Sequence, residues 1–340
     1  MTSKALRADA LGDWLSAILG SGVQLVAPVE EEGLRLFRPV ERVEEICLAE
    51  GNTRWSFKEV LFPRSEPLLF YRFEGKRVEL AEPELPQGET VVFGARPCDA
   101  AGLAVLDAVY SWDYDNPFYR SRRERTTIVG VSCAEPAPAC FCTAAGLSPT
   151  GTRGSDLLLT RVGEVYLAEG VTEKGERLMA AHESFFTDAA PDKAAATAAA
   201  EEKISRKASI VPKDPPPLQA LFDDPRWKAF GLRCHGCGTC AFICPTCHCF
   251  DIVDEGNARG GSRCKNWDSC GHCHFTLHTS GHNPRPNQPA RVRQRVLHKL
   301  RYIPERFGIV ACVGCGRCVT TCPVNVDIYE IAQTLGVTGR

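Results

Sequence analysis

The stretches CHGCGTCAFICP (residues 234–245) and CVGCGRCVTTCP (residues 312–323) repeat one cysteine pattern, C-x2-C-x2-C-x3-C-P. Three cysteines at intervals of three residues wind a tight loop, so that three thiolates can reach three irons of one cubane. Glycines between them let backbone amides approach the cluster sulfurs, and the proline suits the first turn of a helix. Two complete copies of this pattern, called the first and second runs below, indicate [4Fe–4S] clusters.

The fourth cysteine of each run predicts a crossed arrangement. In two-cluster ferredoxins this cysteine points away from its own loop and binds the other cluster. We therefore predict that one cluster is held by Cys234, Cys237, Cys240 and Cys322, and the other by Cys312, Cys315, Cys318 and Cys244. Two alternatives stay open at this point: each run serves its own cluster, or the thiols bind zinc, which also uses C-x2-C pairs.

The composition and the N-terminal sequence predict the cellular compartment of the protein. The chain has 340 residues, 18 cysteines and a formal net charge of −2, so no overall charge attracts it to nucleic acid or to an anionic membrane. The first 22 residues read as an amphipathic helix without the apolar core of a signal peptide. No apolar stretch approaches the roughly 20 residues that cross a bilayer. We expect a cytoplasmic protein with reduced thiols and without membrane insertion.

The cysteines divide the chain unevenly, because five lie in the first 186 residues and the other 13 lie between Cys234 and Cys322. This asymmetry predicts an α+β protein with two domains. The first, residues 1–186, reads as a mixed α/β domain. Residues 187–218 read as a helical and proline-rich linker, and residues 219–340 as a partly helical, two-cluster ferredoxin-like domain.

Local patterns predict the elements of these domains. A helix at 99–110, with the strands on either side of it, would form a parallel βαβ unit. Short apolar stretches bounded by turn residues predict strands at 23–26, 34–37, 68–73, 90–93, 127–132 and 156–162. Further helices are expected at 172–182, 189–208 and 290–302, and loops at 256–261 and 280–289.

A third group of cysteines follows the first run. Cys247, Cys249 and Cys270, together with Cys273 or Cys264, would supply four ligands to a third metal site. The alternative is that these are small buried side chains near the clusters, since free cysteine is among the most buried residue types. The cofactor prediction is therefore two [4Fe–4S] clusters and a possible third.

Four cysteines of the first domain form another candidate set. Cys98 and Cys133 follow two predicted parallel strands, at the sheet edge where α/β proteins place their sites. Cys140 and Cys142 can face one metal only if the chain turns between them, because neighbours two apart on a flat strand are separated by a side chain on the opposite face. Buried, unligated thiols are the alternative here also, and Cys47 is interpreted as core packing.

Several longer motifs identify a family. They are FP-x-SE (62–66), GARPCD (94–99), CFC (140–142), CPTCHCF (244–250), WDSC (267–270), SGHN (280–283), R-x2-HK (295–299) and CVGCGRC (312–318). Over most of its length the chain resembles a family of iron–sulfur subunits found in cytoplasmic sulfhydrogenases, as the β subunit, and in anaerobic sulfite reductase. The resemblance implies electron transfer inside a complex, between a flavin subunit that reacts with NAD(P)H and a catalytic subunit such as a hydrogenase or sulfite reductase.

The sequence lacks motifs for other chemistry. It has no glycine-rich nucleotide loop, no H-E-x-x-H and no recognisable Ser/His/Asp arrangement, and an electron carrier needs none of these. Two other hypotheses remain. One is a self-sufficient redox enzyme with its active site at Cys98–Cys142, and the other is a zinc-stabilised binding protein without redox activity.

Overall fold

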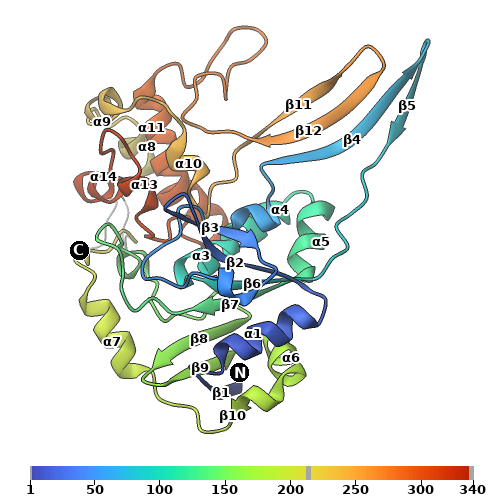
Figure 1. The fold of residues 1–340 in the computed structure, drawn as a ribbon. Helices are drawn as coiled ribbons and strands as arrows, with labels where there is room; N and C mark the ends of the chain where they lie inside the picture. Colours follow the sequence, from blue (N-terminus) through green and yellow to red (C-terminus); the bar gives the residue numbers. More distant parts are fainter. Residues whose placement is uncertain (1, 212–215, 337–340) are drawn as a thin grey trace.

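An eight-stranded sheet forms the N-terminal part of the molecule in a computed structural model that describes residues 2–211 and 216–336 (Figure 1). Its strand order is β10-β1-β9-β8-β7-β6-β2-β3. The pairs β2–β6, β6–β7 and β7–β8 are parallel and the others antiparallel. The strands are β1 (Thr2–Arg7), β2 (Gln24–Glu31), β3 (Leu34–Pro39), β6 (Thr90–Ala95), β7 (Thr126–Val131), β8 (Leu157–Val162), β9 (Val165–Gly170) and β10 (Phe186–Thr187).

Both faces of this sheet are covered, because alternate residues of β6 enter two different cores. Val91 and Phe93 pack with α1 (Leu11–Gly20) and α6 (Glu173–Ala181), whereas Val92 packs on the other face. Such alternation is the two-residue period of a strand buried on both sides. The second core is completed by α2 (Lys58–Leu61), α4 (Leu103–Tyr110) and α5 (Pro117–Arg125).

The predicted α+β fold is confirmed, as are the six predicted strands and the parallel pairing around the βαβ unit. The helix of that unit consists of α3 (Pro97–Ala101) and α4. The prediction of a helix from the first residue is wrong over residues 2–7. These residues form β1, because backbone bonding to β9 and β10 outweighs their helical pattern.

A second, four-stranded sheet extends away from the body of the molecule, with the order β11-β12-β4-β5 (Figure 1). The loop predicted at 256–261 is confirmed only at residues 258–259, which form the hairpin turn, and is wrong at residues 256–257 and 260–261, which belong to strands. Its glycines lie at the tip of a hairpin, where a Cβ on Gly256 would lie 2.6 Å from the hydroxyl of Tyr71. They mark close packing of strands. The strands are β4 (Ser65–Glu74), β5 (Arg77–Ala81), β11 (Phe250–Asn257) and β12 (Gly260–Trp267).

Short helices and cysteine loops build the C-terminal part. Their core contains Val296, Leu297 and Leu300 from one long helix and Ile328 and Ile331 from the last one. The predicted helix at 290–302 is confirmed, and its second half is a π-helix. The helices are α8 (Leu218–Phe222), α9 (Trp227–Arg233), α10 (Thr239–Phe242), α11 (Gln288–Leu297), π-helix η4 (His298–Tyr302), α12 (Ile303–Phe307), α13 (Arg317–Thr320) and α14 (Ile328–Thr334).

Between the two parts, the helix predicted at 189–208 is shorter than expected, since α7 spans Ala194–Glu202. Residues 212–215 of the predicted proline-rich spacer lie outside the described residues. The domain limits 1–186, 187–218 and 219–340 stay a prediction. The described residues also form the 3-10 helices η1 (Val43–Glu45), η2 (Thr143–Ala145) and η3 (Glu183–Phe185). Among the described residues, no helix has the length and apolar character of a membrane span.

Candidate metal centres

The first thiol set lines one cavity beneath α11. Its members are Cys234, Cys237 and Cys240 of the first run and Cys322 of the second run. The amide of Gln288, at the start of α11, donates to Cys234 Sγ over 3.3 Å. The structure therefore brings together the four cysteines that the crossed prediction assigns to one cluster. Cys237 is exposed to solvent, and its hydrogen bond with Thr239 lowers the pKa of its thiol.

The second thiol set is buried. Burial raises the pKa of Cys312 to about 12, and the neighbouring thiols of Cys318 and Cys244 act in the same direction. Burial also raises the pKa of Cys315, again with contributions from Cys244 and Cys318. The fourth cysteine of the first run thus lies among the three thiols of the second run, which is the other half of the crossed arrangement.

A third cavity lies next to the second set. Cys247, Cys249 and Cys270 line it, together with two imidazoles. A hydrogen bond with Cys270 is the main cause that lowers the pKa of Cys249 to about 6. Two other candidate ligands lie elsewhere. Cys264 is on β12, with its sulfur 3.2 Å from Ser262 Oγ, and Cys273 is exposed in the loop before α11.

The fourth thiol set gathers at the carboxyl edge of the large sheet. Cys98 lies in α3, directly after β6, and Cys133 follows the neighbouring parallel strand β7. The chain turns before Cys140, whose N–H donates to the carbonyl of Ala137 over 2.8 Å. Burial raises the pKa of Cys142 to about 12, and the thiols of Cys140 and Cys133 contribute. Turns therefore lie on both sides of the CFC motif, one ending at Cys140 and one starting at Cys142, and the four thiols lie near one another.

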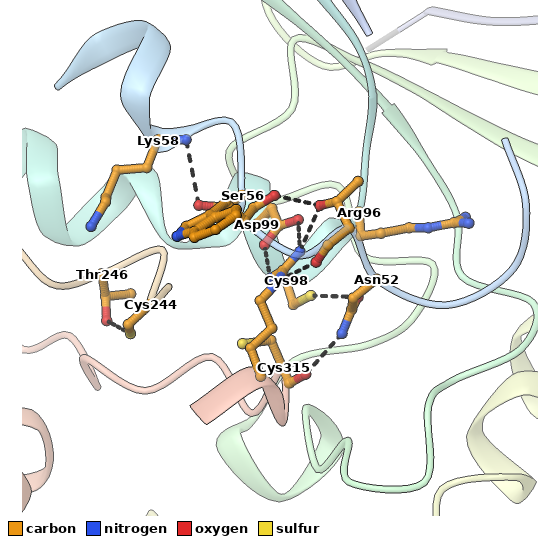
Figure 2. Close-up of polar contacts among 12 residues, drawn as sticks. Asn52, Ser56, Lys58, Arg96, Cys98, Asp99, Cys244, Thr246 and Cys315 are labelled. Carbon is orange, nitrogen blue, oxygen red and sulfur yellow. Dashed lines mark hydrogen bonds and ion pairs between the residues drawn. The ribbon is translucent and has the colours of Figure 1, made fainter. Parts of the chain in front are cut away.

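Direct contacts join the fourth set to the second. Asn52 donates to the carbonyl of Cys315 over 2.8 Å and lies 4.0 Å from Cys98 Sγ (Figure 2). Its amide nitrogen also lies 3.6 Å from Cys140 Sγ. The N–H of Phe141 donates to the carbonyl of Gly314 over 2.7 Å. The loop between the two cysteines of the CFC motif is thus bonded to the cluster loop of the second run.

Buried cations surround these thiols. Lys299 Nζ donates to Cys244 Sγ over 3.3 Å and to Thr246 Oγ1 over 2.7 Å. Burial opposes the charge on Lys299, but the thiols of Cys244 and Cys247 raise its pKa above the usual value. Lys58 donates to the carbonyl of Cys247 over 2.9 Å. Sequence reasoning did not single out Gln288, and it named Arg295 and Lys299 only as members of the R-x2-HK motif, without a role beside the thiols. Their spacing of seven and four residues places the three side chains along one side of a helix.

Arg295 tests whether the residues present fit an anionic cluster. It lines both the first and the third cavities, and its buried Nε has no hydrogen-bond partner among the described residues. Burial opposes the charge, yet the thiols of Cys240 and Cys318 raise the pKa of Arg295 well above its usual value. A buried cation without a counterion is costly, and iron–sulfur clusters with thiolate ligands supply negative charge at this position. The residues fit that group.

The arrangement of side chains also bears on whether a single metal ion, rather than a cluster, could bind. Within residues 2–211 and 216–336, no group of three or more His, Cys, Asp or Glu side chains is arranged to hold one metal ion. The 18 cysteines are all free thiols in the structure.

Comparison with known proteins agrees with the thiol geometry. Residues 233–326 match the family model described as a 4Fe-4S dicluster domain, so the C-terminal part is an iron–sulfur domain. The chain is also 29% identical over 312 residues to subunit beta of sulfhydrogenase 2 from Pyrococcus furiosus, an alignment that covers 91% of each chain. Both comparisons support the resemblance of this chain to the family of 4Fe–4S dicluster electron-transfer subunits. No solved structure matches the chain.

Proposed function

We propose that this chain relays electrons inside a cytoplasmic, multi-subunit oxidoreductase. Its partners are a flavoprotein subunit that reacts with NAD(P)H and a catalytic subunit of the hydrogenase or sulfite reductase type. The relative from Pyrococcus furiosus carries the name of a subunit, which supports a role inside an assembly. The observation that carries the proposal is the adjacency of the thiol sets, which extend from the exposed Cys237 to the edge of the N-terminal sheet.

Two [4Fe–4S] clusters with crossed ligands occupy the first two sets in this proposal. Cys234, Cys237, Cys240 and Cys322 hold the outer one, and Cys312, Cys315, Cys318 and Cys244 hold the inner one. Clusters of this type supply one-electron redox chemistry. The chain's own residues ligate them, keep water from the inner set and donate hydrogen bonds to cluster thiolates from Gln288 and Lys299.

The second set is the junction of the proposed relay. It adjoins the first set through Cys240 and Cys318. Burial and the thiol of Cys318 raise the pKa of Cys240, and, although burial opposes its charge, both thiols raise the pKa of Arg295 beside them. It adjoins the third set through the hydrogen-bonded pair Cys244 and Cys247. Asn52 and Phe141 link it to the fourth set, where Cys98, Cys133, Cys140 and Cys142 are proposed as ligands of an additional centre.

Single Cys→Ser variants of anaerobically purified protein test the crossed assignment. With EPR of the reduced clusters as the readout, Cys322→Ser and Cys237→Ser are expected to perturb the same signal, and Cys318→Ser a different one. Cys47→Ser is the matched control, because Cys47 lies outside all four sets. If Cys322→Ser and Cys318→Ser perturb one common signal, each run serves its own cluster and the crossed assignment is wrong.

Co-purification tests the place in a complex. A tagged chain expressed from its native host is expected to retain two further redox proteins, one of them containing flavin, through gel filtration under anaerobic conditions. Colourless protein without inorganic sulfide would overturn the electron-transfer role. Turnover by the isolated chain with an artificial electron donor, lost in Cys98→Ser, would favour a self-sufficient enzyme instead.

A further inference from the structure

The third cavity presents three thiols and lacks a fourth. Cys247 and Cys249 come from the segment after the first run, and Cys270 comes from the turn after β12. The two cysteines that could complete the set by sequence, Cys264 and Cys273, do not line it. A [4Fe–4S] cluster has four irons, so a fourth ligand must come from the side of the cavity that these two segments do not form. That side is the end of α11 and the start of η4.

His298 lies on that side of the cavity. It is the first residue of the π-helix η4, and its ring is one of the groups that line the cavity. The side chain is half-buried, and in the part of the chain that the structure describes neither ring nitrogen has a hydrogen-bond partner, which leaves both free to bind a ligand. Single π-helical turns inside α-helices occur frequently at functional sites.

His248 is the other imidazole of the cavity, and its position suits a supporting role. It stands between Cys247 and Cys249 in a segment without helix or strand. Its Nδ1 is 3.0 Å from the carbonyl of Thr246. Its ring packs edge-on against His298, with 5.5 Å between centroids, and holds that imidazole in place.

We propose that Cys247, Cys249, Cys270 and His298 hold a third [4Fe–4S] cluster, with the imidazole as its one neutral ligand. Arg295, whose Nε has no hydrogen-bond partner among the described residues, lines this cavity as well as the first, so an anionic group in either cavity would face a buried cation. The inference rests on the iron–sulfur function proposed above and adds a centre to it. A neutral imidazole in place of a thiolate lowers the negative charge of the site. A cluster held by these four residues would carry less negative charge than one held by four thiolates, which would raise its reduction potential.

Pulsed EPR of the reduced protein tests the ligand directly. Protein labelled with 15N-histidine is expected to show strong nitrogen hyperfine coupling on one cluster signal. In His298→Cys that coupling disappears, the iron and sulfide content stays the same, and the midpoint potential of that signal falls. His278→Ala is the matched control, because this exposed histidine lies in the loop before α11 and away from the cavity. It should leave the spectrum unchanged.

Other results separate this inference from the function on which it rests. Wild-type protein without histidine coupling, or coupling that persists in His298→Cys, overturns the proposed ligand. Loss of the coupling in His248→Gln alone identifies His248 as the ligand and overturns it as well. Two clusters only, with spectra insensitive to Cys270→Ser, overturns the third centre and leaves the two-cluster relay intact. Absence of every cluster signal overturns the relay itself. The wild-type measurement needs no variant to fold.

Discussion

Around the first run, Cys237 is exposed, and Cβ atoms added to Gly236 and Gly238 would meet the side chains of Gln288 and His272. Around the second run, the thiols of Cys312 and Cys315 are buried, and Cβ atoms on its two glycines would meet main chain of residues 139–142. One cysteine spacing is therefore placed in two environments. The first run is partly exposed to solvent, whereas the second run packs against the N-terminal part of the chain.

This difference gives the two runs different parts in the proposed relay. Exchange with a partner protein requires a cluster near the surface, and the first set meets that condition. The second set is held by Arg317, which pairs with Asp99 and donates to the carbonyl of Thr53 over 2.8 Å. These contacts connect a cluster loop to the GARPCD motif of the large sheet. The second run thus joins the two parts of the molecule as well as carrying ligands.

Arg317→Met should give the largest effect. Arg317 and Asp99 are 4% and 0% exposed in their side chains, and removal of one partner of a buried pair costs about 3–5 kcal/mol. Chemical unfolding of the anaerobic holoprotein measures the loss. The matched control is Thr239→Val at the equivalent position of the first run, where the lost hydrogen bond to Cys237 is worth about 1 kcal/mol. Equal losses at the two positions would contradict the difference between the runs.

Gly314→Ala and Gly236→Ala sharpen the same contrast with a smaller effect. Both glycines have left-handed backbone, with φ of 63° and 72°, so alanine costs about 1–2 kcal/mol at either position. At Gly314 the new Cβ would also lie 2.4 Å from the carbonyl oxygen of Phe141, which belongs to the main chain. Overpacking of this kind adds about 1–3 kcal/mol. At Gly236 the nearest atoms belong to the Gln288 side chain, which can move.

Thermal unfolding of the holoprotein reports this difference, with the wild-type chain as reference. The Gly314 variant is expected to unfold at the lower temperature, and iron content measured beforehand ensures that both variants are loaded. A Gly236 variant that is the less stable of the two would show that the first run is the more tightly packed one.

The sequence alone predicts those features of the molecule that depend on local sequence patterns. The spacing of the two runs predicts which cysteines meet, and the apolar stretches at 90–93 and 127–132 predict two parallel strands. Sequence reasoning missed what depends on distant pairing. Residues 2–7 become a strand only because β9 and β10 lie beside them. Lys58 reaches the cysteines only because α2 packs near a loop almost 190 positions later. No local signal encodes such a contact.

The smallest predicted effect concerns two hydrogen bonds that residues of α11 and η4 donate to proposed cluster thiolates. Lys299 gives a charged donor to Cys244 in the inner set, and Gln288 gives a neutral donor to Cys234 in the outer set, each over 3.3 Å. Reduction adds negative charge to a cluster, so a lost donor lowers its midpoint potential. Charged hydrogen bonds are worth about 1 kcal/mol more than neutral ones, which for one electron is about 40 mV.

Lys299→Met should therefore lower the potential of the inner cluster by about 40 mV more than Gln288→Leu lowers that of the outer one. EPR-monitored redox titration of each variant gives both values, because the two signals are assigned by the Cys→Ser series. In either variant the potential of the other cluster serves as the internal control. A larger shift at the outer cluster would mean that solvent, and not the buried lysine, dominates the difference between the two runs.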